Sequence, residues 1–128
     1  MNNSQLILDC FGCPKEKLAD MATVFTALDK MPAKLGMDSK AEPKVFSYSG
    51  EGIENDGVSG VIMVNESHIS IHTFPDKGQA FVSIFSRQEF DPEAAKQELI
   101  RLFEAKKHEV ITQSRKESLD SFSSRIIH

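Results

Sequence analysis

The stretch 68–86 reads HISIHTFPDKGQAFVSIFS and places two alternating segments on either side of a turn. Residues 69–73 alternate apolar with polar side chains, which is the pattern of a half-buried β-strand. Pro75 and Gly78 supply the residues of a tight turn, and residues 81–85 supply a second strand. The stretch therefore predicts an antiparallel hairpin.

Short apolar segments elsewhere in the chain predict further strands, at residues 4–10, 44–48, 58–64 and 108–112. Residues 65–68 link the strand at 58–64 to the hairpin.

Apolar residues spaced three and four apart predict two amphipathic helices. The first opens at Pro14, ends before Pro32 and Gly36, and carries an apolar stripe of Leu18, Met21, Phe25 and Leu28. The second is capped by Asp91, opens with Pro92 and buries Ala95, Leu99, Leu102 and Phe103. The set predicts an α+β fold, a two-layer α/β sandwich in which helices cover one face of a mainly antiparallel sheet. The other face must be solvated or paired.

The 128 residues, 40% of them hydrophobic, can fill one core, so we expect a single domain over residues 1–128. Residues 115–128 are mostly serine and charged residues, and we expect them to form a loose tail. Cys10 and Cys13 are the two cysteines, too few for a disulfide framework or a four-thiolate zinc site, and we expect them to be small buried residues.

Charge and hydropathy exclude several classes of protein. Fifteen Lys and Arg against 19 Asp and Glu give a net charge of -4, which offers no general attraction for nucleic acid or anionic lipid. The longest apolar run, residues 61–64, is far too short to span a membrane, and residues 1–15 lack the layout of a secretory signal. We expect a cytoplasmic protein that binds neither nucleic acid nor membrane.

Polar groups concentrate in residues 66–76, which hold two histidines, two serines and two carboxylates. His68, Ser70 and His72 share one face of a strand and can simply form its solvated side. A zinc site is rejected, because His68 and His72 would lie about 13 Å apart along a strand. A serine hydrolase is disfavoured, because residues 57–60 only superficially resemble the Gly-x-Ser-x-Gly elbow.

The same residues carry a family resemblance. Gly57-Val58-Ser59-Gly60, Glu66-Ser67-His68-Ile69-Ser70-Ile71-His72-Thr73-Phe74-Pro75, Gly12-Cys13 and Phe85-Ser86 are similar to motifs of the prokaryotic S-adenosylmethionine decarboxylases. These are self-processing enzymes of polyamine, and specifically spermidine, synthesis. The resemblance covers nearly the whole chain and implies cleavage between Glu66 and Ser67.

The resemblance also implies the cofactor and the catalytic groups. Ser67 would become a pyruvoyl group, whose ketone serves as the electron sink for decarboxylation without an external cofactor. His72 would be the base in self-processing, and Ser59 would assist by hydrogen bonding. Because Ser67 and His72 are five residues apart, a regular strand would point them to opposite faces, so we expect Ser67 in an irregular turn before the strand.

For substrate binding, the resemblance implies that Asp76 holds the ribose hydroxyls, at a position where the family commonly has Glu. Phe46 and Tyr48 are candidates for stacking against adenine. Phe74 is a further candidate, with a place in the core as its other interpretation. We also expect a homodimer of processed units, because a single helical layer leaves one sheet face to be covered and the family places its active sites near subunit interfaces.

Arg87 and Ser83 depart from the family pattern, which has a proton-donating Cys and an Asp at these positions. A guanidinium cannot replace a thiol as an acid, although it can bind a carboxylate. Three hypotheses remain open. The chain is an S-adenosylmethionine decarboxylase in which another group replaces the proton-donating Cys, or a pyruvoyl-dependent arginine or ornithine decarboxylase of the same family. The third hypothesis is an unprocessed, non-catalytic paralogue that acts as a partner subunit.

Overall fold

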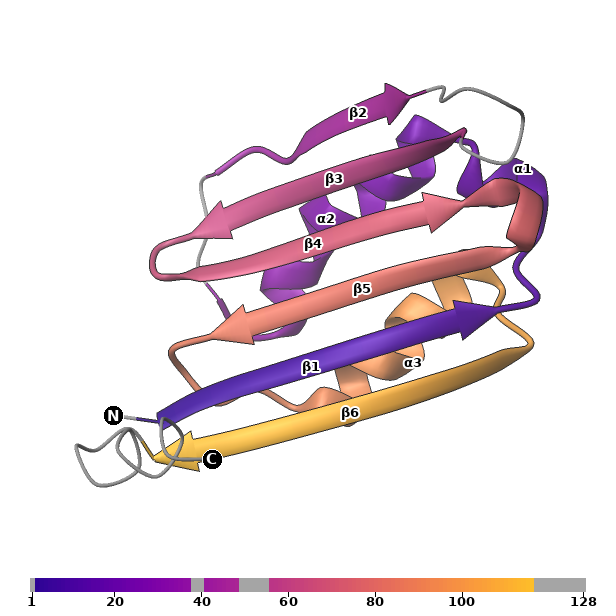
Figure 1. The fold of residues 1–128 in the computed structure, drawn as a ribbon. Coiled ribbons are helices and arrows are strands. Elements are labelled where there is room, and N and C mark those ends of the chain that lie inside the picture. The colour runs from indigo at the N-terminus through magenta and orange to yellow at the C-terminus, as the bar shows by residue number, and fades with distance from the viewer. Residues whose placement is uncertain (1, 38–40, 49–55, 117–128) are drawn as a thin grey trace, which may run out of the picture.

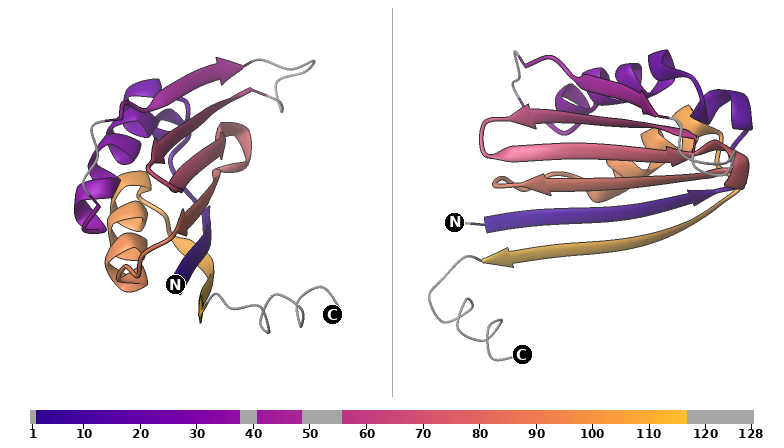
Figure 2. Two further views of the ribbon diagram at one scale, coloured as in Figure 1. Left: turned by 90° about the vertical axis from the view of Figure 1, so that its left-hand side faces the viewer. Right: turned by 45° about the horizontal axis from the view of Figure 1, so that its top comes forward.

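A computed structural model describes residues 2–37, 41–48 and 56–116. Six antiparallel strands form one sheet in the order β2-β3-β4-β5-β1-β6 (Figure 1). The strands are β1 (Asn2–Phe11), β2 (Lys44–Tyr48), β3 (Gly57–Val64), β4 (Ser67–Phe74), β5 (Gln79–Ser86) and β6 (Lys107–Lys116). The helices α1 (Lys15–Leu18), α2 (Met21–Lys34) and α3 (Pro92–Phe103) lie on one face of this sheet, as Figure 2 shows edge-on. The predicted two-layer α+β sandwich is confirmed.

The hydrophobic core lies between the helices and one face of the sheet. Alternate residues of β4 and β5 point into it, including Ile69, Ile71, Val82 and Ile84, each at most 1% exposed. Leu99 and Phe103 of α3 pack into the same core and are fully buried. Burying each of these side chains contributes about 1.5 to 3 kcal/mol, so the sheet and the helices stabilise one another. No helix in the described ranges is both long enough and apolar enough to cross a membrane.

The first predicted helix is two helices in the structure. The Asp20 carboxylate accepts a hydrogen bond from the Ala22 N–H at 3.0 Å and starts α2 afresh. With this new start, α2 buries Val24, Ala27, Leu28, Met31 and Pro32. Met21 and Phe25 are exposed by 41% and 42%, so the predicted stripe of Leu18, Met21, Phe25 and Leu28 is not the buried side of the helix. Pro32 does not end the helix either, because it lies in the last turns of α2, where little helix remains to be disturbed.

The last strand is longer than predicted. β6 pairs with β1 along its whole length, from Phe11 opposite Lys107 to Asn2 opposite Lys116. A polar strand needs no apolar face when its backbone groups are satisfied by a long neighbour. The predicted loose tail is therefore wrong for residues 115 and 116, whereas residues 117–128 lie outside the described part of the chain.

Cys10 and Cys13 are both free and buried, as expected. Burial raises the pKa of the Cys10 thiol to about 12 and that of the Cys13 thiol to about 11. Both thiols are un-ionised at neutral pH and act as small core residues.

Candidate active site

The β3–β4 hairpin turns through two residues, Asn65 and Glu66, with Val64 paired opposite Ser67. Asn65 has a φ of 54°, in the left-handed region that asparagine tolerates better than most residues. Ser67 thus directly follows a tight turn and is the first residue of a regular strand. The prediction that Ser67 precedes the strand is wrong, because pairing with Val64 already begins at Ser67.

The Ser67 side chain is 5% exposed and its Oγ is held by the end of β5. The peptide N–H of Arg87 donates to Ser67 Oγ at 3.2 Å, and Ser67 Oγ donates to Ser86 Oγ at 3.5 Å. Ser86 is fully buried, and its Oγ also accepts the Gln88 N–H at 3.1 Å. In Figure 1 the β3–β4 turn and the end of β5 lie together at the left edge of the sheet. Ser86 and Arg87 therefore hold the hydroxyl beside the Glu66–Ser67 peptide, and Gln88 in turn donates to Ser86.

An ion pair crosses the same junction. Arg87 Nε lies 3.5 Å from Glu66 Oε2, with side chains 31% and 72% exposed respectively. A cavity of about 230 Å³ adjoins the pair. Its lining residues are Met37, Val64, Asn65, Glu66, Ser67, Arg87 and Gln88. The cavity is large enough for the amino-acid end of a small molecule but smaller than a typical site for a drug-sized ligand.

The second predicted group lies on the other face of the sheet, which we call the open face. Ser59 and His72 are paired across β3 and β4, and Ser59 Oγ lies 2.8 Å from His72 Nδ1. His72 is exposed, whereas Ser67 is buried on the helix side of the same strand. Five residues of strand span about 16 Å. The structure therefore brings Ser59 and His72 together and keeps both away from Ser67.

Phe46 and Phe74 belong to neither of these contacts. Phe46 is 60% exposed and is paired opposite Ser59 in β2, so it borders the Ser59–His72 pair on the open face. Phe74, the last residue of β4, is half-buried and does not belong to the buried core.

Asp76 and Tyr48 lie at the opposite end of β4 from Ser67. Asp76, in the short 3₁₀ helix η2 (Pro75–Lys77), pairs with Lys15 Nζ at 2.7 Å and has a side chain only 18% exposed. The hydrogen bond to Asp76 raises the pKa of the Lys15 ammonium. The Tyr48 hydroxyl donates to the Thr73 carbonyl at 3.4 Å. A cavity of about 230 Å³ is lined by Lys15, Ala19, Ser47, Tyr48, Asp56, Gly57, Val58, Pro75 and Asp76.

The glycines of the 57–60 motif have a packing role. A Cβ on Gly60 would lie 2.6 Å from Leu28 Cδ1, so the absence of a side chain lets α2 approach β3 closely. A Cβ on Gly57 would lie 2.4 Å from the Thr73 carbonyl oxygen and 2.7 Å from the Tyr48 hydroxyl. These glycines set the positions of β3 and Tyr48, and Ser59 lies within a regular strand rather than on a hydrolase elbow.

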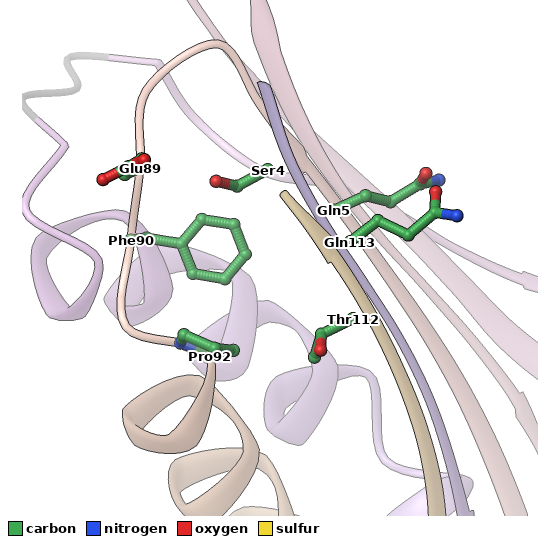
Figure 3. A pocket seen from close by; sticks show the side chains of 7 residues that line it. All are labelled: Ser4, Gln5, Glu89, Phe90, Pro92, Thr112 and Gln113. Atoms are coloured by element: carbon green, nitrogen blue, oxygen red, sulfur yellow. The ribbon is translucent and has the colours of Figure 1, made fainter. Parts of the chain in front are cut away.

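Sequence reasoning missed two residues of these sites. Ser86 entered only as part of the family motif, although its buried hydroxyl accepts the Ser67 hydrogen bond. Lys15 and Asp76 are 61 positions apart, and no local pattern signals their ion pair. A third cavity, of about 250 Å³, contains none of the predicted residues; Figure 3 shows the Phe90 ring pointing into it beside Ser4 of β1.

Comparison with known proteins identifies the family. A family model described as S-adenosylmethionine decarboxylase matches residues 4–116. The chain belongs to the S-adenosylmethionine decarboxylase family. A protein of Thermodesulfovibrio yellowstonii named S-adenosylmethionine decarboxylase proenzyme is 31% identical over 113 residues, covering 88% of this chain and 79% of the relative. One of Pyrococcus furiosus with the same name is 36% identical over 102 residues, covering 78% and 68%.

A solved structure shares the fold. The crystal structure of the adenosylmethionine decarboxylase from Aquifex aeolicus superposes with a TM-score of 0.70 at 20% identity, covering 91% of this chain and 92% of the other. The family resemblance inferred from the sequence motifs is confirmed by the family model, which matches residues 4–116.

Proposed function

We propose that this chain is a self-processing proenzyme that cleaves between Glu66 and Ser67 and then decarboxylates S-adenosylmethionine, as a cytoplasmic enzyme of spermidine biosynthesis. The observation that carries the proposal is the buried Ser67 hydroxyl, held by Arg87 N–H and Ser86 Oγ directly after a two-residue turn. Family membership supports this reaction over decarboxylation of arginine or ornithine and over a non-catalytic role.

Self-processing uses the Ser67 hydroxyl as the nucleophile. Ser67 Oγ attacks the Glu66 carbonyl carbon, the Glu66–Ser67 C–N bond breaks, and the nitrogen takes a proton, which leaves an ester. Loss of the Ser67 Cα proton and breakage of the Cβ–Oγ bond then release residues 1–66 with a free carboxylate. The remaining enamine takes up a proton at Cβ, water adds at Cα, and the nitrogen leaves as ammonium, so that a ketone remains at residue 67. The net reaction consumes one water and releases one ammonium ion, whose charge balances that of the new carboxylate.

The residues around Ser67 fit a pyruvoyl group. The hydroxyl of the precursor is already buried, and the Arg87 N–H and the Ser86 hydroxyl are donors that would hold the group. When formed, the pyruvoyl ketone supplies the electron sink for a decarboxylation. The adjoining cavity lined by Met37, Val64 and Gln88 can accept the amino-acid end of the substrate.

The remaining site residues are assigned by proposal. His72 is the base of self-processing, and Ser59 orients its imidazole through the 2.8 Å contact to Nδ1. For this role the Ser67 hydroxyl must turn from the helix side toward the open face, which is a rearrangement of the first residue of β4. Asp76 binds the ribose hydroxyls, while Tyr48, Phe46 and Phe74 contact the adenosyl group.

A homodimer completes the proposal. The open face carries Phe46, Met63 and Ile111, exposed by 60%, 58% and 62%. These residues lie on β2, β3 and β6, so apolar side chains are exposed at both edges of this sheet face. Exposed apolar side chains on one face are typical of a surface that packs against another layer. We propose that the open faces of two chains meet.

The test is the mass of the purified protein after incubation. The 14.3 kDa chain should give two fragments, residues 1–66 and 67–128, and Ser67→Ala should remain one chain. Residues 67–128 should carry a blocked terminus that is trapped by borohydride together with substrate, and activity should not respond to added pyridoxal phosphate. A chain that stays intact, or activity that depends on pyridoxal phosphate, would exclude the pyruvoyl mechanism.

A further inference from the structure

We infer that the Arg87 guanidinium compensates the charge of the Glu66 side chain during self-cleavage, so that Arg87 acts as a positioning residue of processing through Glu66. The inference rests on the proposed function, because it concerns the same Glu66–Ser67 junction. It assigns a task to the residue that stands where the family has a proton-donating cysteine.

Arg87 approaches the junction from two sides. Its peptide N–H donates to Ser67 Oγ at 3.2 Å, and its side-chain Nε lies 3.5 Å from Glu66 Oε2. The backbone contact exists whatever the side chain is. Substitution of Arg87 therefore removes the guanidinium from Glu66, while the backbone N–H that holds Ser67 Oγ before cleavage is retained.

Negative charge develops at Glu66 in both stages of cleavage. When Ser67 Oγ attacks, the negative charge develops on the Glu66 carbonyl oxygen. In the elimination, the charge develops on the new main-chain carboxylate of Glu66, which is the leaving group. The Glu66 side-chain carboxylate is attached to the same residue and repels this charge. A guanidinium that neutralises the side chain lowers that repulsion, and it does so without any proton transfer by Arg87.

The size of the effect follows from the exposure of the pair. Glu66 is 72% exposed and Arg87 31% exposed, so water and salt screen their interaction. Loss of an exposed ion pair of this kind changes a rate constant by about two- to fivefold, if the whole interaction energy acts on the transition state. The expected signature is thus a modest effect with a definite sign for each residue.

The direction in which each substitution changes the cleavage rate distinguishes charge compensation from a purely structural role of the ion pair in the turn. Arg87→Gln leaves the Glu66 carboxylate uncompensated and should slow cleavage about two- to fivefold. Glu66→Gln leaves the cation alone beside the developing anion and should speed cleavage by a similar factor. If the pair merely fixed the turn, both substitutions would slow cleavage, because each breaks the same contact.

The experiment follows cleavage of the full chain made by cell-free synthesis, with the two fragments separated by mass. Arg87→Gln, Glu66→Gln, the double variant and Arg87→Lys are compared at low and high salt. Arg101→Gln is the matched control, since Arg101 pairs with Glu98 on α3, outside the junction. We expect the opposite signs given above, a double variant between the two, near-normal cleavage for Arg87→Lys, and differences that shrink at high salt.

The outcomes separate the two proposals. Cleavage of the unaltered chain with equal rates in all Arg87 and Glu66 variants, or slower cleavage in both single variants, overturns the charge compensation and leaves the proposed function standing. An unaltered chain that never cleaves overturns the proposed function, and with it this inference.

Discussion

Ser67 and His72 lie on opposite faces of β4, with the Ser67 hydroxyl buried on the helix side and the His72 imidazole exposed 2.8 Å from Ser59 Oγ on the open face. The alternation of a strand requires this for any two residues an odd number of positions apart. A base and a nucleophile must come within hydrogen-bond distance to react. Processing by this pair therefore needs the start of β4 to rearrange.

The first prediction concerns His72. Because a positioned general base contributes about 10² to 10⁴ in rate, His72→Ala should slow self-cleavage by that factor, and Ser59→Ala, which removes only the orienting contact, should slow it less. The rates are measured from the fragment masses over time. His68→Ala is the control, since His68 shares the open face but stacks on Phe85 instead. Normal cleavage in His72→Ala would remove His72 from processing.

The second prediction concerns the open face. Met63→Glu and Ile111→Glu should each weaken dimerisation at least tenfold, because a carboxylate would be buried in an apolar interface. Light scattering at micromolar concentration should give twice the 14.3 kDa chain mass for the unaltered protein and a lower mass for these variants. Phe25→Glu is the matched control, being exposed by 42% on α2 in the helix layer. A monomer that still decarboxylates its substrate would refute the dimer.

The third prediction concerns Asp76 and Lys15. If Asp76 binds the ribose hydroxyls, Asp76→Asn should raise KM for S-adenosylmethionine about tenfold or more, with a smaller change in kcat, because charged hydrogen bonds are the stronger ones. Lys15 competes for the same carboxylate at 2.7 Å, so Lys15→Met should lower KM about two- to fivefold. Lys17→Met, which breaks only the exposed pair with Glu104, should leave KM unchanged. An unchanged KM in Asp76→Asn would show that Asp76 does not bind the ribose hydroxyls.

Sequence patterns predicted the elements of the sheet well, because strands and helices are set by local alternation and spacing. The hairpin of β4 and β5 follows from residues 68–86 alone, with Pro75 and Gly78 marking its turn. Long-range and boundary features could not be read in the same way. With its new start at Asp20, α2 buries a side that the predicted stripe does not match, and the length of β6 depends on β1, about a hundred residues earlier in the chain.

The sequence predicted which residues belong to the candidate site, but it did not predict how they are arranged in space. The family motif pointed to Ser67, His72 and Asp76, yet a motif orders residues along the chain and says nothing of which face each occupies. Strand geometry then separates Ser67 from His72 and places Asp76 at the far end of β4, about 23 Å along the strand. The hydrogen bonds that do reach the Ser67 hydroxyl come from Ser86 and Arg87 at the end of β5, about twenty residues later in the chain.

The last prediction concerns the substrate and again involves Arg87. A guanidinium cannot donate the proton that the family's thiol gives to the decarboxylated carbon, and a missing general acid costs about 10² to 10⁴ in rate. If S-adenosylmethionine is the substrate, Arg87→Cys should restore the acid and raise kcat by up to about 10² to 10⁴. Arg87→Ser introduces a side chain close in size to cysteine but without a thiol, and it should not raise kcat. If Arg87 instead binds a carboxylate or shapes the cavity for a smaller amino acid, Arg87→Cys should lower activity on arginine or ornithine and leave S-adenosylmethionine a poor substrate.

The assay measures carbon dioxide release from all three substrates by the unaltered protein and both variants. Rates must be expressed per cleaved chain, because loss of the Arg87 charge is itself expected to slow processing about two- to fivefold while Glu66 remains ionised. A gain in Arg87→Cys that is absent in Arg87→Ser, and seen with S-adenosylmethionine alone, would identify the thiol as the missing acid. No release from any substrate, by protein shown to be cleaved, would contradict the enzymatic function and favour the role of a partner subunit.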